Sequence, residues 1–196
     1  MNENIKEFFN NIAINYVHDD SKLIEDLLDS LFLEKCPRIL DLGCGKGIIS
    51  EKLALRNKGE VVALDFSSEM IKYAKEKIKN PKVTFVNEDF YEFDSKPFDA
   101  IICFDAYPHF MDVDGFVKKA NELLKEDGLL AIIHDIGRQT LNEHHKRSAG
   151  KVSRLLKAPQ EECEPLLRYF KPIELGESDT YYKIVMIKRW TRLYNK

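Results

Sequence analysis

Residues 39–50 read Ile-Leu-Asp-Leu-Gly-Cys-Gly-Lys-Gly-Ile-Ile-Ser, an apolar run followed by three glycines at alternate positions. This order predicts a strand that ends in a tight loop from which a helix begins, the place where an α/β sheet holds a nucleotide-like ligand. Glycine suits such a loop because the turn needs backbone angles that side chains forbid and because the ligand must approach the main chain closely. A second apolar run over residues 61–64 ends at Asp65, about twenty residues further on, the spacing at which a carboxylate binds ribose hydroxyls.

The spacing of the glycines argues against the two other glycine-rich loops that commonly bind nucleotides. A dinucleotide-binding loop has a third glycine at the position of Ile48, where it lets the helix pack close to the strand. A phosphate-binding P-loop needs Gly-Lys followed by Ser or Thr after a four-residue gap, and residues 45–47 lack both that gap and the hydroxyl.

Residues 40–47, Leu-Asp-Leu-Gly-Cys-Gly-Lys-Gly, resemble the first motif of the class I S-adenosylmethionine-dependent methyltransferases. The resemblance extends over nearly the whole chain and favours the small-molecule branch, which includes enzymes of ubiquinone and menaquinone biosynthesis. It implies that the chain is an S-adenosylmethionine-dependent methyltransferase with S-adenosyl-L-methionine as its cofactor. Residues 8–16 resemble the opening segment of these enzymes, which covers cofactor and substrate; the alternative is a helix that only covers an edge of the core.

The resemblance also implies how the cofactor is held. Phe66 and Met70 would flank it, Asp89 would accept a hydrogen bond from the adenine amine, and Phe90 would lie against the adenine ring. Met70 as plain core and Asp89 in a surface turn are the alternatives. The full set of expected cofactor-binding residues is Tyr16, Asp41, Gly43, Cys44, Gly45, Asp65, Phe66, Met70, Asp89, Phe90 and Cys103.

The order of apolar runs predicts the fold. Strand-like runs alternate with amphipathic helix patterns, which favours a Rossmann-like, doubly wound α/β sheet of seven strands, mostly parallel, with an antiparallel C-terminal strand. A hairpin is expected over residues 171–187, and Gly128 is expected to cap the helix before the fifth strand. With 196 residues, we expect a single methyltransferase domain over residues 1–196, with an N-terminal helical lid (1–35) and a helical cap after strand five (136–165).

Composition restricts the partners. The net charge of −3 and pI near 6.0 give no overall attraction to nucleic acid or anionic membrane. The four cysteines show no metal-binding spacing, and the sequence has neither a leader-like start nor an apolar run of membrane-spanning length. We therefore expect a cytoplasmic protein that binds no nucleic acid; nothing in the sequence indicates its oligomeric state.

The segment after the fourth strand, residues 104–110, leaves the sheet where the transferable methyl group should lie. It lacks the Asn/Asp-Pro-Pro-Tyr/Phe signature of enzymes that methylate base or amide nitrogens. The chain is also compact, and its loop with Tyr107 and His109 resembles that of the small-molecule branch. Together these features imply a small-molecule acceptor, acidic or aromatic, that is methylated on oxygen, carbon or sulfur. The catalytic candidates are Tyr107, His109, His134 and His145.

The roles of the histidines and of the cap remain open between alternatives. Histidine titrates near neutrality and suits a general base, but His109, His134 and His145 could instead form a metal site or be structural. The cap could be a solvated helical face or a positive surface that attracts an acidic substrate; its basic residues are Arg138, Lys146, Arg147, Lys151, Arg154 and Lys157. A cofactor-binding module without catalysis, a nicotinamide oxidoreductase and a metal-assisted methyltransferase are the competing functions.

Overall fold

One seven-stranded sheet organises the computed structural model, which describes residues 3–16, 21–147 and 152–190. The strand order is β3-β2-β1-β4-β5-β7-β6. Strands β1 to β5 are parallel, and β7 pairs antiparallel with both β5 and β6, which confirms the predicted doubly wound sheet and terminal hairpin. The strands are β1 Arg38–Leu42, β2 Glu60–Asp65, β3 Val83–Asn87, β4 Phe98–Phe104, β5 Leu124–His134, β6 Phe170–Glu177 and β7 Tyr182–Lys188.

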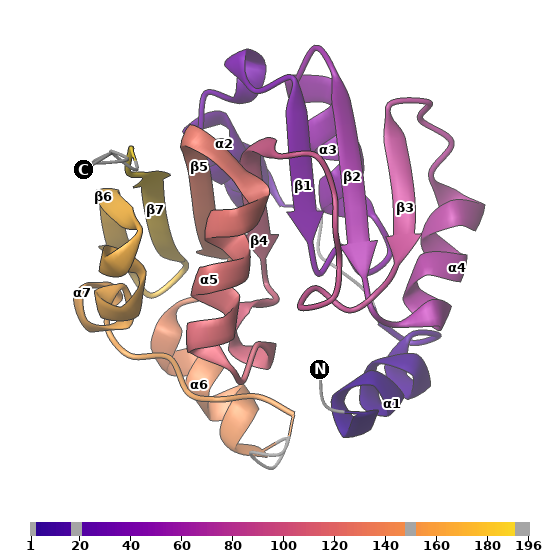
Figure 1. Cartoon of the computed structure of the whole chain (residues 1–196). Helices are drawn as coiled ribbons and strands as arrows, with labels where there is room; N and C mark the ends of the chain where they lie inside the picture. Colours follow the sequence, from indigo (N-terminus) through magenta and orange to yellow (C-terminus); the bar gives the residue numbers. More distant parts are fainter. Residues whose placement is uncertain (1–2, 17–20, 148–151, 191–196) are drawn as a thin grey trace.

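Helices cover both faces of the sheet and one of its edges. In Figure 1, α5 lies in front of the sheet and α2 and α3 lie behind it; α1 lies below the arrowheads of β2 and β3, and α6 lies below α5. The helices are α1 Glu3–Ile12, α2 Lys22–Asp29, α3 Ile48–Arg56, α4 Ser68–Lys77, α5 Val113–Leu123, α6 Arg138–Arg147 and α7 Pro159–Glu162, with short 3₁₀ turns at Leu33–Lys35, Tyr107–His109 and Glu164–Arg168. None of the helices in the described ranges has the length and apolar character needed to cross a membrane.

The central strands are apolar throughout because both of their faces are covered. Alternate side chains point to opposite faces. Ile39 of β1 and Ile102 of β4 pack with α2 and α3, whereas Leu40 and Cys103 pack with α5 on the other face. This two-sided burial explains why these strands read as continuous apolar runs in the sequence.

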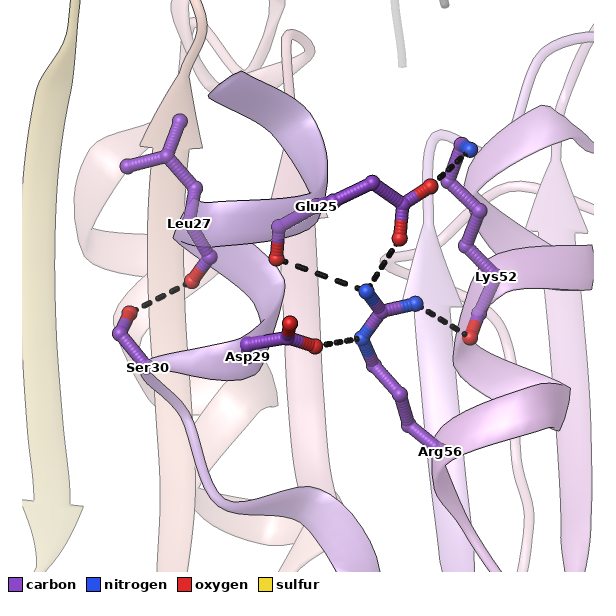
Figure 2. A network of polar contacts seen from close by, with 6 residues as sticks. All are labelled: Glu25, Leu27, Asp29, Ser30, Lys52 and Arg56. Atoms are coloured by element: carbon purple, nitrogen blue, oxygen red, sulfur yellow. Dashed lines mark hydrogen bonds and ion pairs between the residues drawn. The ribbon is translucent and has the colours of Figure 1, made fainter. Parts of the chain in front are cut away.

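A network of charged groups joins α2 to α3 (Figure 2). The Arg56 guanidinium donates from Nε to Asp29 at 2.8 Å and from Nη1 to the Lys52 carbonyl at 3.1 Å. The Glu25 carboxylate accepts from both Lys52 and Arg56, and these hydrogen bonds lower the pKa of Glu25. The network holds the two helices against each other on the face of the sheet opposite α5.

The end of α5 differs from the prediction for Gly128. The helix ends at Leu123 and β5 begins at the next residue, while the left-handed residue in this region is Asp127, at φ 59°. The last carbonyls of the helix are satisfied by a side chain instead: Lys188 Nζ lies 2.8 Å from the carbonyl oxygens of both Asn121 and Leu124. A buried lysine on β7, and not a glycine cap as the sequence pattern predicted, therefore binds the carbonyl groups at the end of this helix.

We expect Lys188→Met to destabilise the fold. The methionine keeps the apolar stem but leaves two carbonyls at the end of α5 without their charged donor, so the free energy of unfolding should fall by about 1–3 kcal/mol. Urea denaturation followed by circular dichroism measures this loss. Lys171→Met, on the exposed side of β6, is the matched control and should change stability by less than about 0.5 kcal/mol. Equal stability of both variants would contradict this role of Lys188.

Candidate active site

A cavity opens at the carboxyl ends of β1, β2 and β4, where the strand order reverses. Its volume is about 880 Å³, counted with the part that is open to solvent. Open α/β sheets bind ligands at this position. Nine of the eleven residues expected to bind cofactor line it: Tyr16, Asp41, Gly43, Cys44, Gly45, Asp65, Phe66, Met70 and Phe90.

The glycine loop after β1 forms the floor of the cavity. Gly43 and Gly45 have φ angles of +76° and +50°, in the left-handed region that disfavours side chains. A Cβ on Gly43 would lie 2.5 Å from the Cβ of Ala106, so this position also needs glycine for packing. A Cβ on Gly45 would approach only the Tyr16 ring, at 4.0 Å, and would project into the space that a ligand would fill.

Asp65, at the end of β2, holds the loop in place. One carboxylate oxygen accepts from the Gly45 N–H at 2.9 Å and the other accepts from the Ser67 N–H at 2.8 Å. Burial raises the pKa of Asp65 to about 6, and the two hydrogen bonds oppose this rise. Each carboxylate oxygen can accept a second hydrogen bond, as binding to ribose hydroxyls requires.

Asp41 lies deeper, at the end of β1. Its carboxylate accepts from the Ser50 hydroxyl at 2.6 Å, which joins β1 to α3. The side chain is almost fully buried, and this burial raises the pKa of Asp41 to about 7. The carboxyl group is therefore partly protonated at neutral pH, which lowers the cost of burying it below the glycine loop.

The N-terminal segment covers one side of the cavity. The Phe9 ring lies 6.0 Å from the Phe66 ring and 4.8 Å from the His109 ring, measured between centroids. Lys46 Nζ in the glycine loop donates to the carbonyl of Tyr16 at 2.7 Å. Residues 3–16 thus contact expected cofactor residues and a catalytic candidate.

Two expected cofactor residues, Asp89 and Cys103, do not line the cavity. Asp89 accepts from the Tyr91 N–H at 3.0 Å, and its neighbour Glu88 lines the cavity instead. Cys103 is fully buried against α5 because alternate residues of β4 face opposite sides of the sheet, and Phe104 is the β4 residue that reaches the cavity.

Among the catalytic candidates, His109 lines the cavity. Its Nδ1 lies 2.8 Å from the carbonyl oxygen of Val152, which can only accept, so Nδ1 carries the proton and Nε2 keeps a lone pair. Burial lowers the pKa of His109 to about 4, and the nearby His145 adds to this effect. The ring is therefore neutral at physiological pH.

Tyr107, His134 and His145 are not part of the cavity wall, contrary to their expected contact with substrate. Tyr107 is fully buried beneath the Arg154 guanidinium, 4.4 Å from its ring centroid, and serves the core. His134 is also buried, with Nδ1 3.1 Å from Oδ1 of Asp105. His145 lies behind His109, with ring centroids 5.5 Å apart.

The metal-site alternative finds no support in residues 3–16, 21–147 and 152–190, where no three metal-ligating side chains come together. His134 faces the carboxylate of Asp105, and His109 is bonded to a backbone carbonyl.

The basic residues of the cap are largely neutralised by acids. Arg138 pairs with Glu177 at 2.6 Å, Lys146 with Glu143 at 2.8 Å, and Arg154 with Glu162 at 2.5 Å. The side chain of Arg147 and the whole of Lys151 lie outside the described residues. The described part of the cap therefore favours the solvated, ion-paired interpretation over a positive surface that attracts substrate.

Phe9 and Asp105 also line the cavity; sequence reasoning placed their segments, 8–16 and 104–110, at the site but did not single out either residue. Asp105 directly follows the last residue of β4, and this position at a strand end is the signal that identifies it. Phe9 comes from a helix whose contact with the sheet edge only the tertiary structure shows.

Comparison with known proteins agrees with this geometry. A family model described as a methyltransferase domain matches residues 40–132. The chain is 33% identical over 134 residues to a malonyl-(acyl-carrier protein) O-methyltransferase of Acetivibrio thermocellus, covering 66% of this chain and 47% of that protein. It is 33% identical over 129 residues to a ubiquinone biosynthesis O-methyltransferase of Pelagibacter ubique, covering 63% and 52%. The chain thus spans about half the length of these curated relatives.

Solved structures share the fold. The N-methyltransferase NodS of Bradyrhizobium japonicum, crystallised with S-adenosyl-L-homocysteine, superposes with a TM-score of 0.74 at 17% identity, covering 94% of this chain and 98% of that one. Residues 40–132 thus match a methyltransferase domain, and the chain has the fold of this solved methyltransferase.

Proposed function

We propose that the protein transfers the methyl group of S-adenosyl-L-methionine to an oxygen, carbon or sulfur atom of a small molecule. The observation that carries this proposal is the joint placement of the glycine loop, Asp65 and His109 around one cavity. The two curated relatives are named as O-methyltransferases, which supports oxygen as the acceptor atom.

The cavity fits the cofactor. Asp65 would accept from the ribose hydroxyls with the oxygen lone pairs that Gly45 and Ser67 leave available, and the loop at Gly45 leaves room for close approach. Apolar contacts to the adenine would come from Phe66, Met70 and Phe90, and Asp89 would bind the adenine amine after a change of its side-chain direction. When bound, S-adenosyl-L-methionine supplies a methyl group on a sulfonium, which makes that group electrophilic.

The protein would contribute alignment, exclusion of water and a base. Phe9 and the segment up to Tyr16 cover the cavity and would keep water from the reacting atoms. His109 would accept the proton of the acceptor hydroxyl at Nε2, because its Nδ1–H is held by the Val152 carbonyl and its low pKa keeps the ring neutral.

The lining of the cavity favours an aromatic acceptor over an acidic one. Rings of Phe9, His109 and Phe110 form part of the wall. The acids Glu88 and Asp105 lie in the same wall, and they would repel an acceptor carboxylate placed beside them.

Two competing functions make different predictions. A cofactor-binding module without catalysis would bind S-adenosyl-L-methionine but label no acceptor. A nicotinamide oxidoreductase would show a thermal shift with the dinucleotide, which we do not expect because Ile48 occupies the place of the third glycine.

Asp65→Ala should weaken binding of S-adenosyl-L-methionine by about tenfold or more, because the ribose hydroxyls would lose their charged acceptor and the N–H groups of Gly45 and Ser67 would lose the carboxylate that holds them. Titration calorimetry measures the dissociation constant, which we expect in the micromolar range for the unmodified protein. Asp94→Ala, at an exposed position, is the matched control. Because Asp65 also holds the loop, each variant is checked for folding by circular dichroism. Undiminished affinity in a folded Asp65→Ala protein would rule out the ribose assignment.

Binding of S-adenosyl-L-methionine should also weaken as the pH falls through about 6. The raised pKa of Asp65 means that its carboxylate gains a proton in this range, and the protonated group is a poorer acceptor. Calorimetry at pH 5.0 and 7.5 tests this, and the difference between the two pH values should shrink in Asp65→Ala. A pH-independent dissociation constant would show that the Asp65 charge does not contribute to binding.

His109→Gln should lower turnover by about 10²-fold or more while leaving the dissociation constant of S-adenosyl-L-homocysteine within about twofold, because proton removal acts in the transition state. The acceptor is found first, by incubating metabolite extracts with methyl-labelled cofactor. His144→Gln, exposed on α6, is the control. Full turnover in His109→Gln would make His109 structural, and label only in RNA or protein would overturn the small-molecule proposal.

A further inference from the structure

Residues 152–157 lie against the loop that carries His109, and we call them the strap. They form neither helix nor strand, yet Val152, Ser153 and Leu156 are buried. A buried segment of irregular backbone needs hydrogen-bond partners from other parts of the chain. The strap finds such partners in the loop after β4, in α6 and in α7, and these partners fix the direction of its backbone groups.

Arg154 connects the strap to both chain neighbours of His109. Its N–H donates to the Pro108 carbonyl at 3.0 Å, and its Nε donates to the Phe110 carbonyl over a longer distance of 3.4 Å. The guanidinium also lies over the Tyr107 ring, with Cζ 4.4 Å from the ring centroid. The residues before and after His109 are therefore both held by one arginine.

Two further groups hold the strap from the side of the cap. The Glu162 carboxylate in α7 accepts from Arg154 Nη1 at 2.5 Å and from the Lys157 N–H at 2.9 Å. The Asn142 side chain in α6 exchanges two hydrogen bonds with the backbone of Leu156, both of 2.9 Å. The strap is therefore fixed at three positions within four residues.

Burial makes the Arg154–Glu162 ion pair a weak source of stability. The two side chains are 17% and 5% exposed. Taking both charges out of water costs free energy that offsets most of their attraction. A guanidinium instead provides direction, because its N–H groups lie in one plane at fixed angles. Here those N–H groups point to Glu162 and to the Phe110 carbonyl, so the pair fixes the geometry around His109.

We propose that Arg154 is a positioning residue for His109. Held by Glu162, it keeps the strap against the loop, so that the Val152 carbonyl, 2.8 Å from Nδ1, keeps the ring proton on that nitrogen. Nε2 then retains the lone pair that accepts the proton of the methyl acceptor. This inference rests on the proposed function and adds to it a residue outside the cavity wall.

The ring tautomer of His109 tests the proposal before any acceptor is known. Long-range ¹H–¹⁵N spectra of the full chain, assigned with His109→Gln, should show the proton of this ring on Nδ1. Arg154→Met keeps the apolar stem but has no side-chain donor, so its spectra should show a mixture with the proton on Nε2. An unchanged tautomer in a folded Arg154→Met protein would overturn the positioning role, as would an Nε2 proton in the unmodified chain.

Arg38→Met is the matched control. The Arg38 side chain is 19% exposed, pairs with Glu60 and lies 4.4 Å from the centroid of the Phe98 ring, so its surroundings resemble those of Arg154. It begins β1, at the opposite end of that strand from the cavity. We expect this variant to keep the tautomer of the unmodified chain. The same tautomer change in both arginine variants would indicate general destabilisation and overturn the proposal.

Glu162→Gln provides a milder variant in case Arg154→Met does not fold. It removes the charge that holds the guanidinium and should change the His109 tautomer in the same direction. Because both substitutions act on one link, the double variant should show no larger change than Arg154→Met alone. A folded Glu162→Gln protein with an unchanged tautomer, or additive effects in the double variant, would contradict the link.

Turnover separates this inference from the proposed function. With the acceptor found by labelling, Arg154→Met should lower kcat by about tenfold or more and leave the dissociation constant of S-adenosyl-L-homocysteine within about twofold. Full turnover in this variant, with methyl transfer intact, would overturn only the role of Arg154. Absence of any labelled acceptor, with a tautomer that depends on Arg154, would contradict the proposed function and leave the positioning of the His109 ring in place.

Discussion

The site depends on one carboxylate, that of Asp65, which accepts from the backbone N–H groups of Gly45 and Ser67. The first bond holds the loop after β1 in its left-handed path, and the second fixes the start of α4, where the Ser67 hydroxyl accepts from the Met70 N–H as the helix cap. Ser67 in turn donates to Asn10 at 2.7 Å, which attaches α1. Because burial raises the pKa of Asp65, these contacts are maintained by a group whose charge is costly to bury.

The second constraint is the reversal of strand order between β1 and β4. Parallel strands on each side of this point send their following segments to opposite faces of the sheet, so the strand ends separate and leave a crevice. The glycine loop and Asp65 occupy one side of it, and Asp105 and His109 occupy the other. One half of the cavity is thus built from backbone and acids, and the other half from rings and an acid.

Several basic residues in the described part of the cap are paired with acids. The cap reads as basic in the sequence, but Arg138 and Arg154 lie within ion-pair distance of Glu177 and Glu162, which follow them in the chain. Arg154 also covers the Tyr107 ring, and its N–H donates to the Pro108 carbonyl at 3.0 Å. Arg154 therefore attaches the cap to the segment that carries His109, and the charges of Arg138 and Arg154 are each balanced by an acid.

The sequence by itself determined the strands, their alternation with helices and the cofactor half of the site, because local patterns encode them. These patterns are apolar runs that are covered on both faces of the sheet, glycines where the backbone is left-handed, and acids at strand ends. It did not determine how residues pack on the side of the cavity that carries His109. The burial of Tyr107, the contact of His134 with Asp105, and the use of Lys188 in place of a Gly128 cap arise between segments far apart in the chain or from the side of the sheet that a residue faces. Such contacts follow from packing in three dimensions, which residue spacing along one chain does not specify. The sequence therefore placed residues 104–110 and His109 at the site, and the tertiary structure alone decided how the residues around them pack.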